Sequence, residues 1–465
     1  MKPLSRLVIA GTHSGVGKTT VATALMAAFR QRGHAVQGFK VGPDFIDPTF
    51  HSAATGRPGR NLDGWMLPRE ANLALFQRAM QDAGVAVIEG VMGLFDGQSA
   101  VSMSGSTAEM ARWLDAPVIL VVDASAMAGS AAALVKGFET FDPELRVSGV
   151  VFNCVAGAGH FAYLRDALTA HCRAKPLGYL PRDPAIELPE RHLGLKLAEE
   201  VISEDRLQAL ARWVEEHLDL DEILALGRVA SFAPQAGGQP VSYPCPTHPP
   251  RIGVARDRAF CFYYQDNLDM LASLGAELVE FSPTADAHLP AGLGGLYLGG
   301  GYPELHAAAL SANEPMRAGI AGFAKSGGPV YAECGGFMYL SEGIVDQEGC
   351  LHPMAGVFPT RSRMHSRLAA LGYAEIEGID ASGWLQPGER ARGHEFRYSD
   401  IDEMPGHVER IYRFFSKGGE KREGFRQGAT LAGYVHLHFL SCPQFAERFV
   451  TACAGYSQVL TVKRK

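Results

Sequence analysis

The chain has 465 residues, which is too many for one ordinary hydrophobic core and indicates two or three domains. Its hydrophobic content of 47% and charged content of 20% are typical of a soluble globular protein, and its formal net charge of −7 excludes a general nucleic-acid binder, because no basic excess is available to neutralise phosphates. The eight cysteines include no CxxC pair, the N-terminus does not resemble a signal peptide, and no apolar stretch is long enough for a membrane span. We therefore expect a cytoplasmic protein with reduced thiols.

The first half alternates short β-rich runs with helical patterns, which predicts parallel βαβ units. Residues 229–250 are rich in Pro, Gly and Ser without periodicity, which indicates a linker, and the α/β pattern restarts at residue 251. The sequence therefore predicts an α/β fold with a parallel-sheet domain at 1–228 and a second α/β domain at 251–465. In the first domain we expect a helix at 19–33 and buried strands at 6–11, 35–42, 85–90, 117–125 and 147–155.

The stretch GTHSGVGKT (11–19) follows the first strand and opens the first helix, which is the context of a phosphate-binding P-loop. Backbone N–H groups of the turn would surround the phosphates, Lys18 would reach the β- and γ-phosphates, and Thr19 would give its hydroxyl to Mg²⁺. The first glycine of the GxxxxGK[ST] pattern would fall at Thr12, while Gly11 stands one place earlier, so a plain glycine turn is the alternative. The residues predicted to bind ATP are Thr12, Gly15, Gly17, Lys18, Thr19, Thr20, Lys40 and Asn153.

Acidic residues follow two of the predicted strands. Glu89 ends a buried strand at the place where a P-loop protein puts the acid that holds Mg²⁺ or a bridging water. After the second strand, KVGPDFIDP supplies Lys40, Asp44 and Asp47 at the strand end, where ligands of an open parallel sheet bind. We predict that Asp44 contacts the substrate, that Asn153 reads the adenine edge, and that the Mg²⁺ ligands are Thr19, Asp47 and Glu89. A simple turn is the alternative role for Asp47 and for Asn153.

In the second half an apolar strand, PVYAEC, runs into Cys334 and is followed by two glycines and a helical stretch. Such an elbow exposes a nucleophile at a helix N-terminus, where the helix dipole favours a thiolate. The later stretch YVHLHF (434–439) predicts a strand with His436 and His438 on one face, because the side-chain period of a strand is two. A histidine within reach would deprotonate the thiol and then protonate the leaving ammonia.

The loop LYLGGGYPE (296–304) offers backbone N–H groups suited to an oxyanion hole. A lone cysteine is usually buried and inert, so a small apolar core residue is the alternative for Cys334. The elbow, the histidine strand and the glycine-rich loop together favour a nucleophile. The predicted catalytic residues are Cys334, His436 and His438.

In combination these motifs resemble a known group of enzymes. The ECGG elbow, the GGGYPE loop and the YVHLHF stretch resemble the cobalamin-type branch of class I glutamine amidotransferases. GTHSGVGKT, KVGPDFIDP and EGVMGLFDG resemble the ATP-dependent amidoligase half that is joined to it. AFCFYYQDNLDML (259–271) and LGYLPRDPAIELPERHLGL (177–195) resemble the cobyrinic acid a,c-diamide synthase family in particular, and the resemblance covers nearly the whole chain.

The resemblance implies a P-loop amidoligase domain followed by a class I glutamine amidotransferase domain. The second would hydrolyse glutamine through a Cys334 thioester and release ammonia. The first would transfer the γ-phosphoryl group of ATP to a carboxylate of cobyrinic acid, and ammonia would displace phosphate to leave an amide. The implied cofactors are ATP and Mg²⁺, and the implied partners are glutamine and a polycarboxylate tetrapyrrole; a homodimer is left open.

Several alternatives remain at this stage. Hydrogenobyrinic acid and nickel-sirohydrochlorin are a,c-dicarboxylate macrocycles that residue logic does not separate from cobyrinic acid, and cobyric acid synthase is a more distant alternative. A non-catalytic nucleotide sensor is disfavoured, because both Cys334 and His436 are present. Candidate partners for a polyanionic macrocycle, for which a plain surface role is the alternative, are Arg60, Arg361, Arg363 and Arg397.

The chain departs from two wider patterns. Most class I glutaminases have a GxCxG motif and carry Glu two residues after the catalytic histidine. Here Glu333 directly precedes the thiol and His438 occupies that Glu position, so the residue that orients His436 is open. His13 stands where partition-type ATPases carry a signature lysine, so we do not expect a DNA-segregation switch.

Overall fold

The computed structural model describes residues 4–186, 197–229, 248–381, 383–416 and 419–463. The chain divides into two compact units, Met1–Gln239 and Pro240–Lys465, and the division falls inside the predicted linker. Residues 230–247 of that linker and the end of the 177–195 motif lie outside the described residues. Among the helices that are described, none has the length and apolar character needed to cross a membrane.

The first unit is built on a parallel sheet. All its neighbouring strands run in the same direction, so their carboxyl ends lie at one edge of the sheet. The α/β fold with a parallel N-terminal sheet is therefore confirmed, and the five predicted strands are present with ends shifted by one or two residues. In sheet order the strands are β3 (Arg60–Leu62), β2 (Val36–Val41), β4 (Val85–Glu89), β1 (Ser5–Gly11), β5 (Val118–Asp123), β6 (Val147–Asn153) and β7 (Lys175–Leu180).

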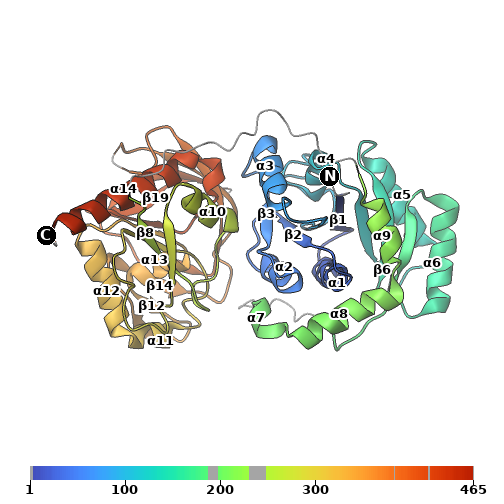
Figure 1. The fold of residues 1–465 in the computed structure, drawn as a ribbon, viewed down its shortest axis with the longest axis horizontal. Coiled ribbons are helices and arrows are strands. Elements are labelled where there is room, and N and C mark those ends of the chain that lie inside the picture. The colour runs from blue at the N-terminus through green and yellow to red at the C-terminus, as the bar shows by residue number, and fades with distance from the viewer. Residues whose placement is uncertain (1–3, 187–196, 230–247, 382, 417–418, 464–465) are drawn as a thin grey trace. The chain divides into compact units, whose positions relative to one another are not determined.

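Helices connect these strands and cover the sheet (Figure 1). Helix α8 begins where the Ser203 side chain accepts the N–H of Arg206, and acidic residues in its first turn favour the positive end of the helix dipole. Its buried face, which includes Leu210 and Val214, shares a core with Leu25 and Phe29 of α1, and α8 packs beside α1 (Figure 1). The helices are α1 (Lys18–Gln31), α2 (Asp47–Thr55), α3 (Arg69–Ala79), α4 (Thr107–Trp113), α5 (Ser130–Phe141), α6 (Ala158–His171), α7 (Ala198–Val201), α8 (Glu204–His217) and α9 (Leu220–Leu226).

The second unit contains a large mixed sheet and a small one. The strands from β20 to β9 in the large sheet are parallel, and those from β21 to β20 are antiparallel. The large sheet has the order β21 (His436–Leu437), β16 (Arg390–Arg397), β15 (Ala370–Gly378), β18 (Glu409–Ser416), β19 (Gly419–Gln427), β20 (Thr430–Gly433), β11 (Val330–Glu333), β10 (Gly295–Leu298), β8 (Arg251–Ala255) and β9 (Glu277–Phe281). The small sheet has the order β13 (Leu351–Pro353), β12 (Ser341–Val345), β14 (Phe358–Met364) and β17 (Ser399–Ile401).

The prediction of one continuous strand over 434–439 is wrong. Strand β20 ends at Gly433, and only the two residues of β21 pair with β16 before a 3₁₀ turn starts at Phe439. The Asn267 side chain donates to the carbonyl of Leu437 at 2.7 Å and accepts the N–H of Phe439 at 2.8 Å, so it takes the place of a strand partner. The helices of this unit are α10 (Gln265–Ser273), α11 (Ala307–Ala312), α12 (Glu314–Lys325), α13 (Gly335–Leu340), the 3₁₀ turn η1 (Phe439–Ser441) and α14 (Pro443–Lys463).

Candidate active sites

The glycine-rich loop between β1 and α1 has the geometry of a phosphate cradle. Gly15 and Gly17 have φ of 85° and 95°, a left-handed conformation that side chains disfavour. A Cβ at Gly17 would also lie 2.4 Å from Nδ2 of Asn153, whose amide donates to the carbonyl of Val16 at 2.9 Å. The N–H of Thr12 donates to the carbonyl of Val121 at 3.3 Å. Hydrogen bonds with residues of β5 and β6 thus hold the loop in place before the first turn of α1. Backbone N–H groups at the start of a helix attract anions.

Lys18 lies buried at this turn, and its Nζ donates to the carbonyl of His13 at 3.2 Å. Burial and the neighbouring Lys40 lower the pKa of Lys18 to about 8, although the carboxylates of Glu89 and Asp47 oppose the shift. A phosphate in the loop would supply a counter-charge to this ammonium group. Thr20 lies in the same turn of α1 and is partly exposed.

The carboxylate of Glu89, at the end of β4, is the centre of a buried polar cluster. Its Oε1 accepts hydrogen bonds from Thr19 Oγ1 at 2.7 Å and from Lys40 Nζ at 3.0 Å, and its Oε2 lies 2.7 Å from His51 Nε2. Lys40 Nζ also lies 2.7 Å from Asp47 Oδ2. Burial opposes the charge of Glu89, but Lys40, His51 and Thr19 outweigh it and hold the pKa of Glu89 well below its usual range.

The three residues predicted from KVGPDFIDP lie in two places. Lys40 and Asp47 both belong to the Glu89 cluster. Burial lowers the pKa of Lys40, but the charges of Asp47 and Glu89 outweigh it and raise that pKa above its usual value. Asp44 stands at the start of α2, where its Oδ1 accepts the N–H groups of Ile46 at 2.8 Å and Asp47 at 2.9 Å. The substrate role of Asp44 stays a prediction.

Sequence reasoning missed two residues at this edge of the sheet. His51 is fully buried, and its position four residues after Asp47 on α2 is the signal that could have placed it beside the same cluster. Asp96 accepts the N–H of Gly93 at 2.8 Å, and its charge acts on Lys18. Asp96 lies in EGVMGLFDG (89–97), one of the stretches that carried the family resemblance, whereas His51 lies three residues after KVGPDFIDP (40–48).

The donor set at this edge suits a hard cation. Thr19 Oγ1, Glu89 and Asp47 offer oxygen atoms, which Mg²⁺ prefers. Within the described part of the chain, no three His, Cys, Asp or Glu residues are arranged to hold a metal by themselves. Mg²⁺ would therefore need phosphate oxygens and water as further ligands, which is how it binds in nucleotide sites.

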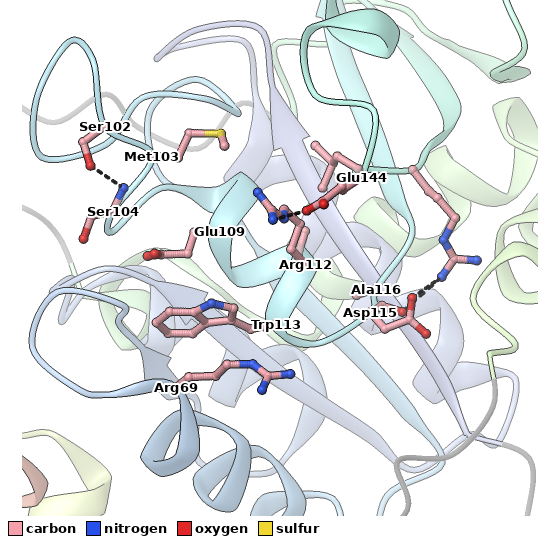
Figure 2. Close-up of a pocket in the computed structure, with 13 residues that line it drawn as sticks. Arg69, Ser102, Met103, Ser104, Glu109, Arg112, Trp113, Asp115, Ala116 and Glu144 are labelled. Carbon is pink, nitrogen blue, oxygen red and sulfur yellow. Dashed lines mark hydrogen bonds and ion pairs between the residues drawn. The ribbon is translucent and has the colours of Figure 1, made fainter.

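A cavity of about 570 Å³ lies elsewhere in the first unit (Figure 2). Asp115 lies three residues before β5 and Arg146 directly precedes β6, so this cavity lies at the amino ends of these strands, opposite to the glycine-rich loop. Four of its charged residues form two ion pairs: Arg146 contacts Asp115, and Arg112 contacts Glu144 (Figure 2). We therefore do not assign it to the nucleotide.

In the second unit Cys334 stands at a sharp turn between β11 and α13. Its φ of 48° is left-handed, which is rare for a residue with a side chain and marks a strained elbow. A Cβ at Gly335 would lie 2.9 Å from Cδ of Pro303, and one at Gly336 would lie 2.1 Å from the carbonyl oxygen of Leu298. The two glycines thus let the elbow pack against β10 and the loop that follows it.

The surroundings of Cys334 keep the thiol protonated. Burial and the charge of Glu304 raise the pKa of Cys334 to about 12, and Arg397 and the N–H of Gly335 oppose the shift. Burial therefore outweighs the helix N-terminus, which was expected to favour a thiolate. The Cys334 Sγ lies 3.9 Å from the carbonyl oxygen of Phe396. A nucleophilic thiol at this position needs a base.

His436 is a buried base beside the glycine-rich loop. A Cβ at Gly300 would lie 2.3 Å from Cε1 of its ring, so only glycine lets the loop approach it. Burial lowers the pKa of His436 to about 3, so the imidazole is neutral near pH 7. Its ring stacks on that of His394 with centroids 5.0 Å apart, whereas the ring of His438 packs against Tyr264 at 4.7 Å.

The loop 299–304 is hydrogen-bonded to the segment AFCFYY (259–264). The N–H of Gly299 donates to the hydroxyl of Tyr263 at 2.8 Å, and the carbonyl of Gly300 accepts the N–H groups of Cys261 and Phe262 at 3.0 Å each. The nitrogen of Gly301 lies 3.1 Å from where a Cβ of the neighbouring Gly335 would be. The backbone nitrogen of Gly301 thus lies beside the elbow, and the oxyanion hole stays a prediction.

The four arginines predicted for a macrocycle are divided between the two units, one in the first and three in the second. Arg361 and Arg363 lie half-exposed on β14 and pair with Glu342 and Asp402. Arg397 is largely buried: it pairs with Glu395, its guanidinium lies 4.4 Å from the ring centroid of Tyr434, and its charge acts on Cys334. Arg60 begins β3 in the other unit.

Comparison with known proteins gives these centres a context. Residues 7–195 match the CobQ/CobB/MinD/ParA nucleotide binding domain, and residues 251–444 match the CobB/CobQ-like glutamine amidotransferase domain. The cobyrinate a,c-diamide synthase of Syntrophotalea carbinolica is 46% identical over 97% of this chain and 99% of its own length. The chain belongs to the cobyrinate a,c-diamide synthase family. Members from Priestia megaterium and Dehalococcoides mccartyi are 41% and 42% identical, each over 96% of this chain and 97% of their own length.

Membership of the cobyrinate a,c-diamide synthase family confirms the resemblance that the motifs indicated. A nucleotide site and a glutamine amidotransferase domain are both present in this chain. The two centres described above, at the carboxyl edge of the first sheet and at the Cys334 elbow, lie within the residues matched by these two domains.

Proposed function

We propose that this chain is an ATP- and glutamine-dependent ligase that converts the a and c acetate carboxylates of cobyrinate into amides. The observation that carries the proposal is the presence of two chemically different centres in one member of this family. One centre offers a phosphate cradle with Lys18 and Glu89, and the other offers a strained Cys334 with the neutral base His436. We also propose that the enzyme is cytoplasmic. A measurement of its mass in solution tests whether it forms a homodimer.

In the glutaminase centre, His436 takes the proton of Cys334 and Sγ attacks the side-chain amide carbon of glutamine. The N–H groups of Gly301 and Gly335 stabilise the oxyanion of the tetrahedral intermediate. The imidazolium then protonates the leaving nitrogen, and ammonia departs to leave a thioester on Sγ. Water, deprotonated by His436, attacks the thioester, so glutamate is released and the thiol is restored.

In the nucleotide centre, a carboxylate oxygen of the macrocycle attacks the γ-phosphorus of ATP, and ADP leaves. Lys18 offsets the negative charge that develops on the transferred group. Mg²⁺, held by Thr19 and Glu89 with Asp47 nearby, would neutralise phosphate charge. Ammonia then attacks the acyl carbon, phosphate leaves, and an amide remains. The activation is required because a carboxylate and ammonia do not condense readily in water.

The test is turnover of the purified full-length chain with ATP, Mg²⁺ and glutamine, read by mass for cobyrinate, hydrogenobyrinate and nickel-sirohydrochlorin in parallel. We expect cobyrinate to gain two amides in a reaction that needs both ATP and glutamine. Faster turnover of either other macrocycle would move the assignment to that substrate. Absence of ATP-dependent amidation of all three would refute the proposal.

A further inference from the structure

A buried carboxylate lies directly behind the proposed base of the glutaminase. Glu333 is 1% exposed, and its Oε2 lies 3.9 Å from Nδ1 of His436. Tyr331 donates its hydroxyl to Oε1 at 2.7 Å, and Tyr297 donates to Oε2 at 3.0 Å. The backbone N–H of Leu437 donates to Oε1 at 2.9 Å. The carboxylate is therefore held by three donors, while one of its oxygens faces the imidazole.

These contacts connect the nucleophile strand to the base strand. Glu333 ends β11 and is bonded to Cys334 through the chain, whereas Leu437 is the second residue of β21. Strand β21 has only two residues and pairs with β16 alone among the described strands. The bond from Leu437 to Glu333 is thus a second anchor, and it fixes the residue that follows the base.

His438 occupies the position where other class I glutaminases carry an acid. The Asn267 side chain is hydrogen-bonded to the backbone of the residues before and after it, Leu437 and Phe439, and the 3₁₀ turn η1 begins at Phe439. The ring of His438 packs against that of Tyr264, with the ring centroids 4.7 Å apart. The hydroxyl of Tyr264 in turn lies 2.7 Å from Nδ1 of His394. An imidazole cannot supply the negative charge that an imidazolium ion requires, whereas Glu333 can.

We propose that Glu333, the residue directly before the nucleophile, is the acidic positioning residue of this glutaminase. It orients His436 through Nδ1 and stabilises the imidazolium that forms when His436 takes the proton of Cys334. This inference rests on the proposed function, and it assigns the orienting role to the residue before the cysteine instead of the residue two places after the histidine.

The electrostatics support this role near neutral pH. Burial raises the pKa of Glu333 to about 7, although hydrogen bonds from Tyr331, Leu437 and Tyr297 oppose the shift. Above that pH the carboxylate is charged and strengthens His436 as a base; below it the carboxyl is neutral and gives no such support. The titratable groups that face Glu333 or act on it are Tyr263, Tyr297, Tyr331, Tyr412 and His436.

The test compares three variants in the full-length enzyme. Glu333→Gln keeps an acceptor for the Tyr331 hydroxyl and the Leu437 N–H but removes the charge, and Glu333→Asp keeps the charge. Glu423→Gln is the matched control, because Glu423 is also buried, accepts the N–H of Tyr434 at 2.7 Å, and has a pKa that burial and Glu395 raise to about 7. Each variant is assayed for glutamine hydrolysis and for amidation driven by free ammonia.

We expect Glu333→Gln to lower kcat for glutamine hydrolysis on the order of 100-fold, with KM for glutamine within about twofold and ammonia-driven amidation retained. Glu333→Asp should recover part of the loss, and Glu423→Gln should stay within about threefold of the parent. The parent kcat should rise with pH through about 7, and this rise should be absent in Glu333→Gln.

Hydrolysis by Glu333→Gln within threefold of the parent would overturn the inference, as would an equal loss in Glu423→Gln. If Glu333→Gln does not fold, the parent decides: a kcat that is flat from pH 5 to 9 refutes the role of the carboxylate. If the parent hydrolyses no more glutamine than the Cys334→Ala variant, the proposed function is refuted instead. The two failures are therefore distinguishable.

Discussion

Thr19 Oγ1 donates a hydrogen bond to Glu89 Oε1 across 2.7 Å, so the first turn of α1 and the end of β4 meet at one carboxylate. The two residues are 70 positions apart in the sequence and come together because β1 and β4 are neighbours, with Ile9 opposite Glu89 in the parallel register. The same carboxylate accepts Lys40 from β2, on the other side of β4. Residues from α1, β4 and β2 therefore form one polar cluster at this edge of the sheet, beside the glycine-rich loop.

Lys18→Ala and Glu89→Gln should each lower amidation on the order of 1,000-fold with either glutamine or free ammonia as the nitrogen source. In the proposed mechanism Lys18 offsets charge on the transferred phosphoryl group, and Glu89, which accepts a hydrogen bond from Thr19, helps to hold the proposed cation. Glutamine hydrolysis should persist, since it takes place in the other unit. Lys175→Ala is the control, because Lys175 is more than half exposed at the start of β7. Full amidation by Lys18→Ala would contradict the phosphate-cradle assignment.

His51→Ala should lower ammonia-driven amidation roughly tenfold and leave glutamine hydrolysis unchanged. His51 Nε2 lies 2.7 Å from Glu89 Oε2, and without this contact the carboxylate loses the partner that fixes its second oxygen. Steady-state kinetics with varied Mg²⁺ checks this, since a misplaced Glu89 should raise the Mg²⁺ concentration needed for half-maximal rate. An unchanged Mg²⁺ dependence would mean that His51 serves packing alone. His34→Ala, at an exposed position after α1, is the control.

Cys334→Ala should lower glutamine-driven amidation by at least about 10⁴-fold and retain amidation at high free ammonia. In the proposed mechanism the thiol only generates ammonia, while the carboxylate is activated at the glycine-rich loop of the first unit. Cys350→Ala, at an exposed cysteine, should behave like the parent. The check is product formation with each nitrogen source at matched ATP. An equal loss with both sources would contradict the model of two separate centres.

His436→Ala should remove glutamine-driven turnover selectively, and His438→Ala should be milder. His436 lies against the glycine-rich loop at Gly300, as a base beside the oxyanion hole must, whereas the ring of His438 packs on Tyr264. Glutamine hydrolysis and ammonia-driven amidation are measured for both variants. If His438→Ala proved the more damaging change, the two roles would have to be exchanged.

The parts of the two centres that were predictable from sequence are local ones. The P-loop and the Cys334 elbow depend on a few consecutive residues, because Gly15 and Gly17 have a positive φ and a side chain at Gly335 would come too close to Pro303. The fold class was also predictable, because the alternation of strands and helices is likewise visible in short stretches of sequence. Three residues of β3 are too few to show any alternation, so that strand was missed.

Contacts that depend on strand register were not predictable. The prediction that His436 and His438 share one face assumed a continuous strand. The chain leaves β20 at Gly433, however, and next pairs with β16, so the side-chain period of two does not hold through His438. Glu333 was noticed only as a departure from a pattern, because its nearness to His436 follows from tertiary packing that brings the end of β11 beside β21 and not from sequence spacing. His51 could have been placed only by knowing that α2 faces Glu89.

The course of the double amidation follows from the number of centres. The sequence contains one GKT loop and one elbow cysteine, so two carboxylates must use the same centre in succession. Two acetate side chains on one macrocycle are chemically alike, and serving both requires the substrate to be released and rebound or turned in place. Release should let a mono-amide accumulate before the diamide appears, with two ATP and two glutamine consumed per diamide.

A time course read by mass, at substrate in large excess over enzyme, should therefore show the mono-amide rising and then falling. Asp44→Asn and Asp47→Asn should change the height of that maximum, because Asp47 contacts Lys40 beside the cradle and Asp44 holds the start of α2 in place. Appearance of diamide alone, even at limiting ATP, would show that amidation is processive and that release and rebinding is wrong. A product that never gains a second amide would contradict the assignment of a diamide synthase itself.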